Sequence, residues 1–311
     1  MPSEPKKTAD QETTTSLPQT SLIICSRDRP RLLVELVQSV LDGDETPSEM
    51  IIVDDSETPN EPLAAMPTRG GCEIRYRWNH SRGLSRANNA GIALARYEVL
   101  VFTQDDALVT HTWFGSVVRA LASGGRRTVV TGRVLPMKAE VAGGFAPSTV
   151  SDDARTIYEG RPRQDILFMQ NAALYRSAAD EVGPFDERLG PGTPFPAAED
   201  NDYGLRLLNA GYRIMYVPEA VVYHRAWRGE EEYVPLRWSY GVARGGFYAK
   251  YVSLRDRYML RRMVGDFIGH LMHGTRRLAR EPRLAYGDLA LALGILVGAA
   301  RWGLMRSKKV T

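Results

Sequence analysis

Apolar and polar residues alternate in blocks over the first hundred residues. Short apolar runs of the length of a buried strand are separated by segments with apolar residues at helical spacing, such as Leu33, Leu36, Val37 and Val40 within residues 29–41. The predicted strands are SLIIC (21–25), MIIVDD (50–55), EIRYRW (73–78) and EVLVFTQDD (98–106), and the predicted helices are 29–41 and 85–96. This alternation is typical of an open α/β sheet.

Acidic residues stand at the ends of two of these strands. Asp54 and Asp55 end the second strand, and Asp105 and Asp106 end the fourth. Ligands of open α/β sheets bind beyond the carboxyl ends of the strands, so we expect these carboxylates to face one crevice. The alternative is that each pair only forms a solvated turn, because Asp is common after strands.

The second half of the chain is less regular. Its predicted elements are a strand at 128–136, a loop excursion at 137–164, a strand, short helix and turn at 171–190, a helix at 199–211, and two short strands in YRIMYVP and VVYH. The helix at 199–211 has an acidic first turn, which suits the positive end of the helix dipole, and it ends at Gly211.

The C-terminal residues are helical in pattern and strongly basic. From Lys250 to Thr311 there are thirteen Lys/Arg and four Asp/Glu, a net of +9; the chain carries +3, so the rest carries −6. The most apolar stretch, residues 289–300, is too short to span a bilayer. We expect amphipathic helices on a membrane surface, with Arg306, Lys308 and Lys309 near lipid headgroups; packing against the domain or another subunit is the alternative.

Composition limits the class of protein. Hydrophobic residues make up 43% and charged residues 25% of the chain, which is ordinary for a globular protein. Two cysteines do not make a disulfide scaffold, and the N-terminal segment has no apolar signal region, so a cytoplasmic setting is expected. We divide the chain into a disordered lead-in (1–18), a catalytic domain (19–230) and a basic amphipathic helical tail (231–311).

Several common catalytic motifs are missing from the sequence. It contains no Gly-x-Gly-x-x-Gly fingerprint, no Walker A loop and no Gly-x-Ser-x-Gly elbow, and its five histidines are scattered. What remains is a set of carboxylates, one well-placed histidine and several arginines. This set suits a divalent cation and a phosphorylated ligand, because Mg²⁺ and Mn²⁺ prefer oxygen ligands and often share them with phosphates.

Four segments in order resemble one known family. These are SLIICSRDRPRLL, IIVDDSE, NHSRGLSRANNAGIALARYEVLVFTQDDALV and GPFDERLGPGTPFPAAEDNDYGLRLLNAGYRIMYVPEAVVYHR. Over roughly residues 20–228 the chain resembles the inverting family 2 glycosyltransferases. The resemblance implies a GT-A fold, a Rossmann-like open mixed sheet flanked by helices, here followed by the helical tail.

The resemblance also implies a nucleoside-diphosphate sugar donor. Asp55 would accept a hydrogen bond from the base, and an imide N–H favours uracil or thymine, hence UDP or dTDP. A helix N-terminus suits anions, so the turn before residues 85–96 would contact the sugar nucleotide. The other implied donor contacts are Arg27, Gly83, Arg86, Asp105 and Arg228.

A metal site is implied at the position of the Asp-x-Asp motif. Family members often have three acids there, whereas this chain has Gln104-Asp105-Asp106. We assign metal contact to Asp106 and His224, with Mn²⁺ or Mg²⁺ as the cofactor, and a sugar hydroxyl or ribose contact to Asp105. The Gln puts the strength of metal binding in question.

Asp200 is our candidate for the catalytic base. Single displacement at an anomeric carbon requires a carboxylate that takes the proton of the attacking hydroxyl. Glu199 would orient Asp200 or bind an acceptor hydroxyl. The Gly- and Pro-containing loop 190–198 would wall the acceptor site, with Gly192 providing flexibility and Phe195 a stacking platform for a sugar.

The resulting hypothesis is a metal-dependent inverting glycosyltransferase that acts on a carbohydrate or lipid-linked acceptor, cytoplasmic and peripheral to the inner face of the cell membrane. One alternative is a sugar nucleotidyltransferase, but that class would require a Gly-rich loop after the first strand. Another is a non-catalytic nucleotide-sugar-binding protein, which the substitution of an acid by Gln104 would favour. The acidic body argues against a nucleic-acid binder. The sequence leaves oligomerisation open.

Overall fold

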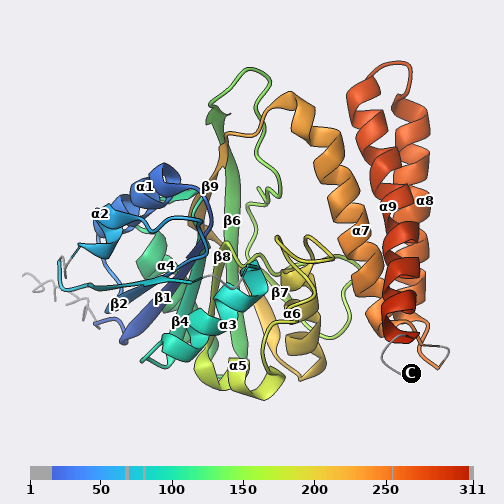
Figure 1. Cartoon of the computed structure of the whole chain (residues 1–311). Coiled ribbons are helices and arrows are strands. Elements are labelled where there is room, and N and C mark those ends of the chain that lie inside the picture. Colours follow the sequence, from blue (N-terminus) through green and yellow to red (C-terminus); the bar gives the residue numbers. More distant parts are fainter. Residues whose placement is uncertain (1–15, 67–69, 80–81, 254, 308–311) are drawn as a thin grey trace, which may run out of the picture.

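The computed structural model describes residues 16–66, 70–79, 82–253 and 255–307. A nine-stranded sheet runs through the molecule in the order β3-β2-β1-β4-β8-β6-β9-β5, and β7 also pairs with β9 (Figure 1). The strands are β1 Thr20–Ser26, β2 Glu49–Asp54, β3 Glu73–Trp78, β4 Val99–Gln104, β5 Ala107–Val109, β6 Thr128–Ala139, β7 Thr156–Tyr158, β8 Asn171–Tyr175 and β9 Arg213–Ala226. The helices are α1 Pro30–Leu41, α2 Glu61–Ala64, α3 Leu84–Leu94, α4 Trp113–Gly124, α5 Arg176–Val182, α6 Glu199–Asn209, α7 Tyr233–Tyr251, α8 Tyr258–Arg277 and α9 Pro282–Ser307.

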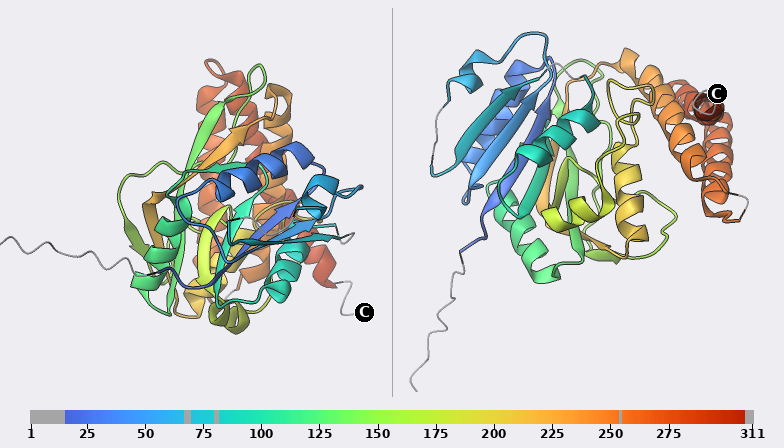
Figure 2. Two further views of the ribbon diagram at one scale, coloured as in Figure 1. Left: turned by 90° about the vertical axis from the view of Figure 1, so that its left-hand side faces the viewer. Right: turned by 60° about the horizontal axis from the view of Figure 1, so that its bottom comes forward.

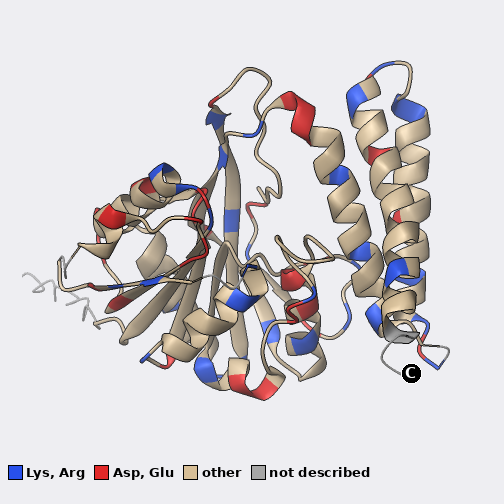
Figure 3. Ribbon diagram, viewed as in Figure 1, with Lys and Arg blue, Asp and Glu red and all other residues tan. Residues whose placement is uncertain are grey.

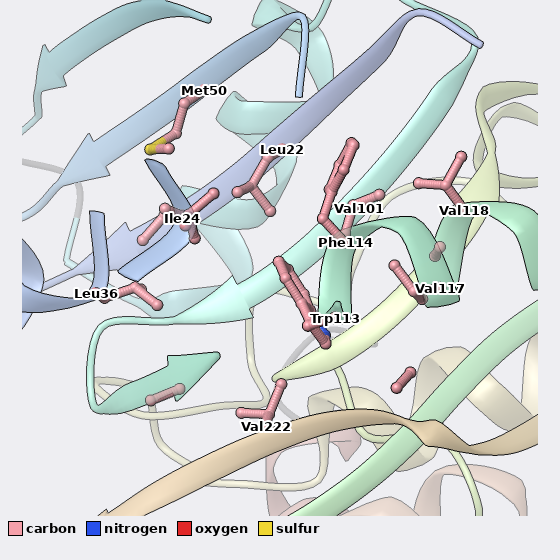
Figure 4. Close-up of a cluster of buried hydrophobic side chains, with 14 of the residues drawn as sticks. Leu22, Ile24, Leu36, Met50, Val101, Trp113, Phe114, Val117, Val118 and Val222 are labelled. Carbon is pink, nitrogen blue, oxygen red and sulfur yellow. The ribbon is translucent and has the colours of Figure 1, made fainter. Parts of the chain in front are cut away.

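Strands β1 to β4 are parallel to one another, and β8 is antiparallel to both β4 and β6. The central strands are buried on both faces, as their continuous apolar runs predict. Leu22 and Ile24 of β1 face a core covered by α1 and α4, whereas Ile23 faces the opposite core beneath α3 and α6. Figure 4 shows the first core, in which the buried Trp113 ring of α4 lies near Val222 of β9. The mixed open sheet with helices on both faces confirms the predicted fold class.

Three local predictions need correction. The two short strands predicted at the end of the domain are one strand, β9, whose pairing with β6 shifts register between Gly132 and Arg133. The predicted excursion at 137–164 contains the short strand β7, and α4 is a helix that the sequence analysis did not predict. The predicted lead-in falls mostly on residues 1–15, outside the described residues.

The C-terminal helices stand beside the α/β domain rather than apart from it (Figures 1 and 2). Helices α7 and α9 approach closely through glycines: a Cβ on Gly245 would lie 2.1 Å from the Ile295 carbonyl oxygen, and one on Gly298 would lie 2.0 Å from the Val242 carbonyl oxygen. Phe195 of the domain packs on Trp302 of α9, with ring centroids 5.1 Å apart. One face of the tail therefore packs on the protein itself, which was the alternative to membrane contact.

Charged side chains also join α7 to the domain. Lys250 donates to the carboxylates of Asp186 (2.8 Å) and Asp202 (2.5 Å), and the Tyr251 hydroxyl donates to Asp202 at 2.7 Å. Asp202 is buried, so its role is to anchor α7 as well as to sit in the first turn of α6.

Helix α9 has the length and composition of a membrane span. Over Pro282–Met305 its best window has a mean hydropathy of 1.5, and 39% of that window is buried inside the protein. The prediction that residues 289–300 are too short to span a bilayer therefore holds only for that stretch, because α9 as a whole is longer. Part of α9 packs on α7, as a core helix does, and the rest of the helix is exposed.

Candidate active site

One pocket of about 700 Å³ opens at the carboxyl ends of the central strands, a size ordinary for a small-molecule site. It collects side chains from strand ends, from loop 190–198 and from the C-terminal helices. Ten predicted site residues line it: Arg27, Asp55, Gly83, Asp105, Asp106, Gly192, Glu199, Asp200, His224 and Arg228. The structure thus brings together residues up to 201 positions apart in the chain, from Arg27 to Arg228.

Arg29 binds both aspartates that follow β4. Its Nη1 donates to Asp105 Oδ1 at 2.7 Å and to Asp106 Oδ2 at 3.0 Å, and its guanidinium stacks over the Trp227 ring. Burial, reinforced by Asp106 and opposed by Arg29, raises the pKa of Asp105 to about 6. Burial alone would raise the pKa of Asp106 too, but the facing His224 and Arg29 outweigh it and hold that pKa low. The adjacent carboxylates are therefore different: Asp106 is the firmly ionised one.

Asp106 and His224 fit a divalent cation as a two-residue site. His224 Nε2 lies 3.6 Å from Asp106 Oδ2, and both side chains are buried. Among the residues that the structure describes, none hydrogen-bonds to the buried atoms Asp106 Oδ1 and His224 Nδ1. Within the described residues no third Asp, Glu, His or Cys joins them, so phosphate oxygens and water would complete the coordination sphere.

The donor side of the pocket is built around Gly83, the residue before α3. Asp55 Oδ2 accepts a hydrogen bond from the Gly83 N–H at 3.2 Å. Gly83 has φ of +134°, which favours glycine, and a Cβ on Gly192 would lie 3.3 Å from Gly83 Cα. Loop 190–198 therefore touches the start of α3, and it joins the predicted donor and acceptor sides.

Glu199 and Asp200 begin α6 directly after a strained residue. Ala198 has φ of +68°, a left-handed conformation that a non-glycine residue rarely adopts and that is often found at functional sites. Burial, and then the neighbouring Asp200, raise the pKa of Glu199 to about 8. Burial also raises the pKa of Asp200, to about 7. A carboxylate with a raised pKa is a stronger base than an ordinary Asp, which suits proton abstraction.

Two predicted site residues lie outside the pocket. Arg86 points to the surface and pairs with Glu187 at 2.9 Å, with both side chains about half exposed. Phe195 is fully buried against Gly246 and Trp302, so the prediction of an exposed sugar-stacking platform at this position is wrong. An aromatic residue in a Gly- and Pro-rich loop gives no local signal of which neighbour will cover it.

The tail contributes pocket residues that the sequence analysis missed. Tyr240 and Arg244 of α7 and Arg262 of α8 line the pocket, and Arg262 pairs with Asp165 at 2.6 Å. Burial raises the pKa of Tyr240, which lies within electrostatic reach of both Glu199 and Asp106. The arginine-rich pattern of these helices was a signal for charge contact, although it did not show that the contact would be with the α/β domain.

Comparison with known proteins places this geometry in a family. The Glycosyl transferase family 2 pattern matches residues 21–181, just over half of the chain. The pre-mycofactocin glycosyltransferases of two Mycobacterium tuberculosis strains, CDC 1551 and H37Rv, are 28% identical to it over 180 residues, which is 56% of this chain. The chain spans 37% of the length of these relatives.

Solved structures show the same fold. The mannosyltransferase PcManGT from Pyrobaculum calidifontis, in complex with GDP-Man and Mn²⁺, superposes with a TM-score of 0.60 at 16% identity, covering 92% of this chain and 88% of that one. TarS 1–349 from S. aureus, in complex with UDP-GlcNAc, gives 0.54 at 14% identity and covers 92% of both chains. These likenesses confirm the predicted GT-A fold. The chain therefore belongs to glycosyl transferase family 2.

Proposed function

We propose that this family 2 chain is a glycosyltransferase that uses a nucleotide-sugar donor. It would invert the anomeric centre, depend on a divalent metal, and move a sugar from a UDP or dTDP donor to a hydroxyl of a glycan or lipid-linked acceptor. The observation that carries the proposal is that Asp200, with a raised pKa, shares one pocket with the Asp106–His224 pair. A base for the acceptor and ligands for a diphosphate-bound cation are the two groups that the reaction needs.

In the proposed step the acceptor oxygen attacks the anomeric carbon from the side opposite the diphosphate. The bond from that carbon to the diphosphate oxygen breaks, and the diphosphate leaves with the electron pair. The hydroxyl proton passes to the Asp200 carboxylate. Asp106 and His224 would hold Mn²⁺ or Mg²⁺, which supplies positive charge to the leaving diphosphate. Configuration inverts because the displacement is single.

Two arginines of the chain support placing the leaving diphosphate at the end of the pocket that holds Asp106 and His224. Arg228 lines the pocket beside Trp227, with its guanidinium 4.3 Å from the ring centroid, and Arg27 lines it near Gly192. We assign both to the diphosphate, and Asp55 to the base, at the carboxyl end of β2. We further propose that the acceptor is met at the inner face of the cell membrane.

A donor screen tests the proposal. Nucleoside diphosphate release is measured for UDP-, dTDP- and GDP-sugars with Mn²⁺ or Mg²⁺, and then in excess chelator. We expect turnover with uridine or thymidine donors that the chelator abolishes. Preference for a guanosine donor would overturn the assignment of Asp55, and full activity in chelator would overturn that of Asp106 and His224.

A further inference from the structure

The outer side of the α8–α9 hairpin carries an unusually apolar exposed surface. We define the α8–α9 apolar face as Val264, Ile268 and Leu271 of α8 with Leu293, Leu296 and Val297 of α9. Their exposed fractions run from 39% for Leu271 to 55% for Leu293. The spacings i, i+4, i+7 on α8 and i, i+3, i+4 on α9 each place three residues on one side of a helix.

The two stripes lie at the same level of the hairpin. Gly274 of α8 meets Leu289 and the Ala285 carbonyl of α9 near the connecting turn, which fixes the antiparallel register. Counting back along α8 and forward along α9 from these contacts brings Ile268 beside the segment that contains Leu293. Figures 1 and 2 show the pair on the side of the molecule away from the sheet. The stripes therefore form one surface that the rest of the described chain leaves open.

Arginines frame this apolar face. Arg276 and Arg280 lie at the turn end and Arg261 lies at the other end, all exposed, whereas the exposed Arg301 of α9 lies over the Phe195 ring on the domain side. Figure 3 shows Lys and Arg toward both ends of the hairpin and few charges between them. The nearby Glu281 is already paired to Arg277, at 3.4 Å. An apolar surface framed by cations matches the boundary between acyl chains and anionic headgroups.

We propose that the α8–α9 apolar face binds the surface of an anionic lipid bilayer, with the helices lying along it. A second copy of the chain fits less well, because a two-fold contact through this face would bring the arginines at the hairpin ends of both copies together. A span through the bilayer also fits less well, because α9 carries the buried Asp288, which is paired with Arg237 and Arg277.

The same helix that would touch lipid also lines the pocket. Arg262 and Asp266 of α8 face the pocket, whereas Val264 and Ile268 face outward. A chain docked in this way would hold its pocket beside the membrane surface. The inference goes beyond the proposed reaction, because the surface can bind lipid whatever donor and acceptor the pocket takes.

Vesicle co-sedimentation of the full chain tests the inference. The vesicles are either pure phosphatidylcholine or three parts phosphatidylcholine to one part phosphatidylglycerol. The test variant combines Ile268→Gln, Leu293→Gln and Leu296→Gln; the control is Ile157→Gln on β7, which is exposed to a similar extent, 49%. We expect the wild type to bind anionic vesicles at least about tenfold better than neutral ones, and the triple variant to lose at least about tenfold in partitioning.

The outcomes are separable. Unchanged partitioning of the triple variant, or equal loss in the Ile157 control, would overturn the inference. Sedimentation velocity without lipid is the second measurement: a wild-type dimer that the triple variant converts to a monomer, with no vesicle binding, would assign the face to a second copy instead. Donor affinity, measured by calorimetry, should be the same in the wild type and the triple variant. A failure of the proposed reaction would therefore be distinguished from a failure of lipid binding.

Discussion

The raised pKa of Asp200 predicts how turnover should depend on pH. If Asp200 is the base and its pKa is about 7, only about 1% of the enzyme carries the ionised base at pH 5. An Asp with the ordinary pKa of 3.8 would be about 94% ionised at that pH. We therefore expect kcat/KM for the acceptor, at saturating donor, to fall about tenfold per pH unit below 7 and to level off above 8.

Two substitutions separate the base from its neighbour. Asp200→Asn should lower kcat by about 10²- to 10⁴-fold, equivalent to about 3–5 kcal/mol of transition-state stabilisation, while donor affinity stays within a few-fold of wild type. Glu199→Gln keeps the shape, and the acidic limb should stay near pH 7, because Glu199, with a pKa of about 8, is still largely neutral where Asp200 ionises. Donor binding is measured by calorimetry over the same pH range, so that changes in binding are not mistaken for titration of the base.

The same pKa shift makes the folding stability of the protein depend on pH. The unfolded carboxyl ionises near 3.8 and the folded one near 7, so ionisation favours unfolding and stability falls as pH rises between these values. Asp200→Asn removes this penalty and should raise Tm at pH 8 but not at pH 4. A flat kcat/KM profile from pH 5 to 8, together with equal Tm values at pH 8, would refute the reasoning.

Three further predictions concern the metal, Arg29 and the tail. Excess chelator should abolish turnover, and restoring Mn²⁺ should recover it; unchanged turnover would contradict the metal assignment. Arg29→Met should lower the free energy of unfolding by on the order of 3 kcal/mol, because the two carboxylates that Arg29 pairs with lose their cation. Added Mn²⁺ should recover part of the lost Tm. The control Arg31→Met, at a side chain that is 69% exposed, should show neither the loss of stability nor the recovery by Mn²⁺. Gly245→Ala should lower the free energy of urea unfolding by about 1–3 kcal/mol, because its Cβ would meet the backbone of α9. Gly265→Ala, at a position with open space around it, should leave that free energy unchanged or raise it by up to about 1 kcal/mol. Equal effects of the two substitutions would contradict the close α7–α9 contact.

Much of the α/β domain follows from local pattern. Continuous apolar runs identify strands buried on both faces, and their ends identify Asp55 and Asp106 as neighbours of one crevice, because parallel strands bring their carboxyl ends to the same edge. The acidic start of α6 likewise follows from the sequence. These features depend on residues close together in the chain, which is why pattern was sufficient to find them.

What only the tertiary structure decided involves partners far apart in sequence. Arg29 meets Asp105 across 76 positions, and Arg262 meets Asp165 across 97. The burial of Phe195 depends on α7 and α9, and the raised pKa of Asp200 depends first on how much of the protein covers it. The sequence by itself determined which elements form and which acids end them. Which side chains are covered, paired or left open was decided by how the elements pack, because burial and charge pairing depend on neighbours in space and not in the chain.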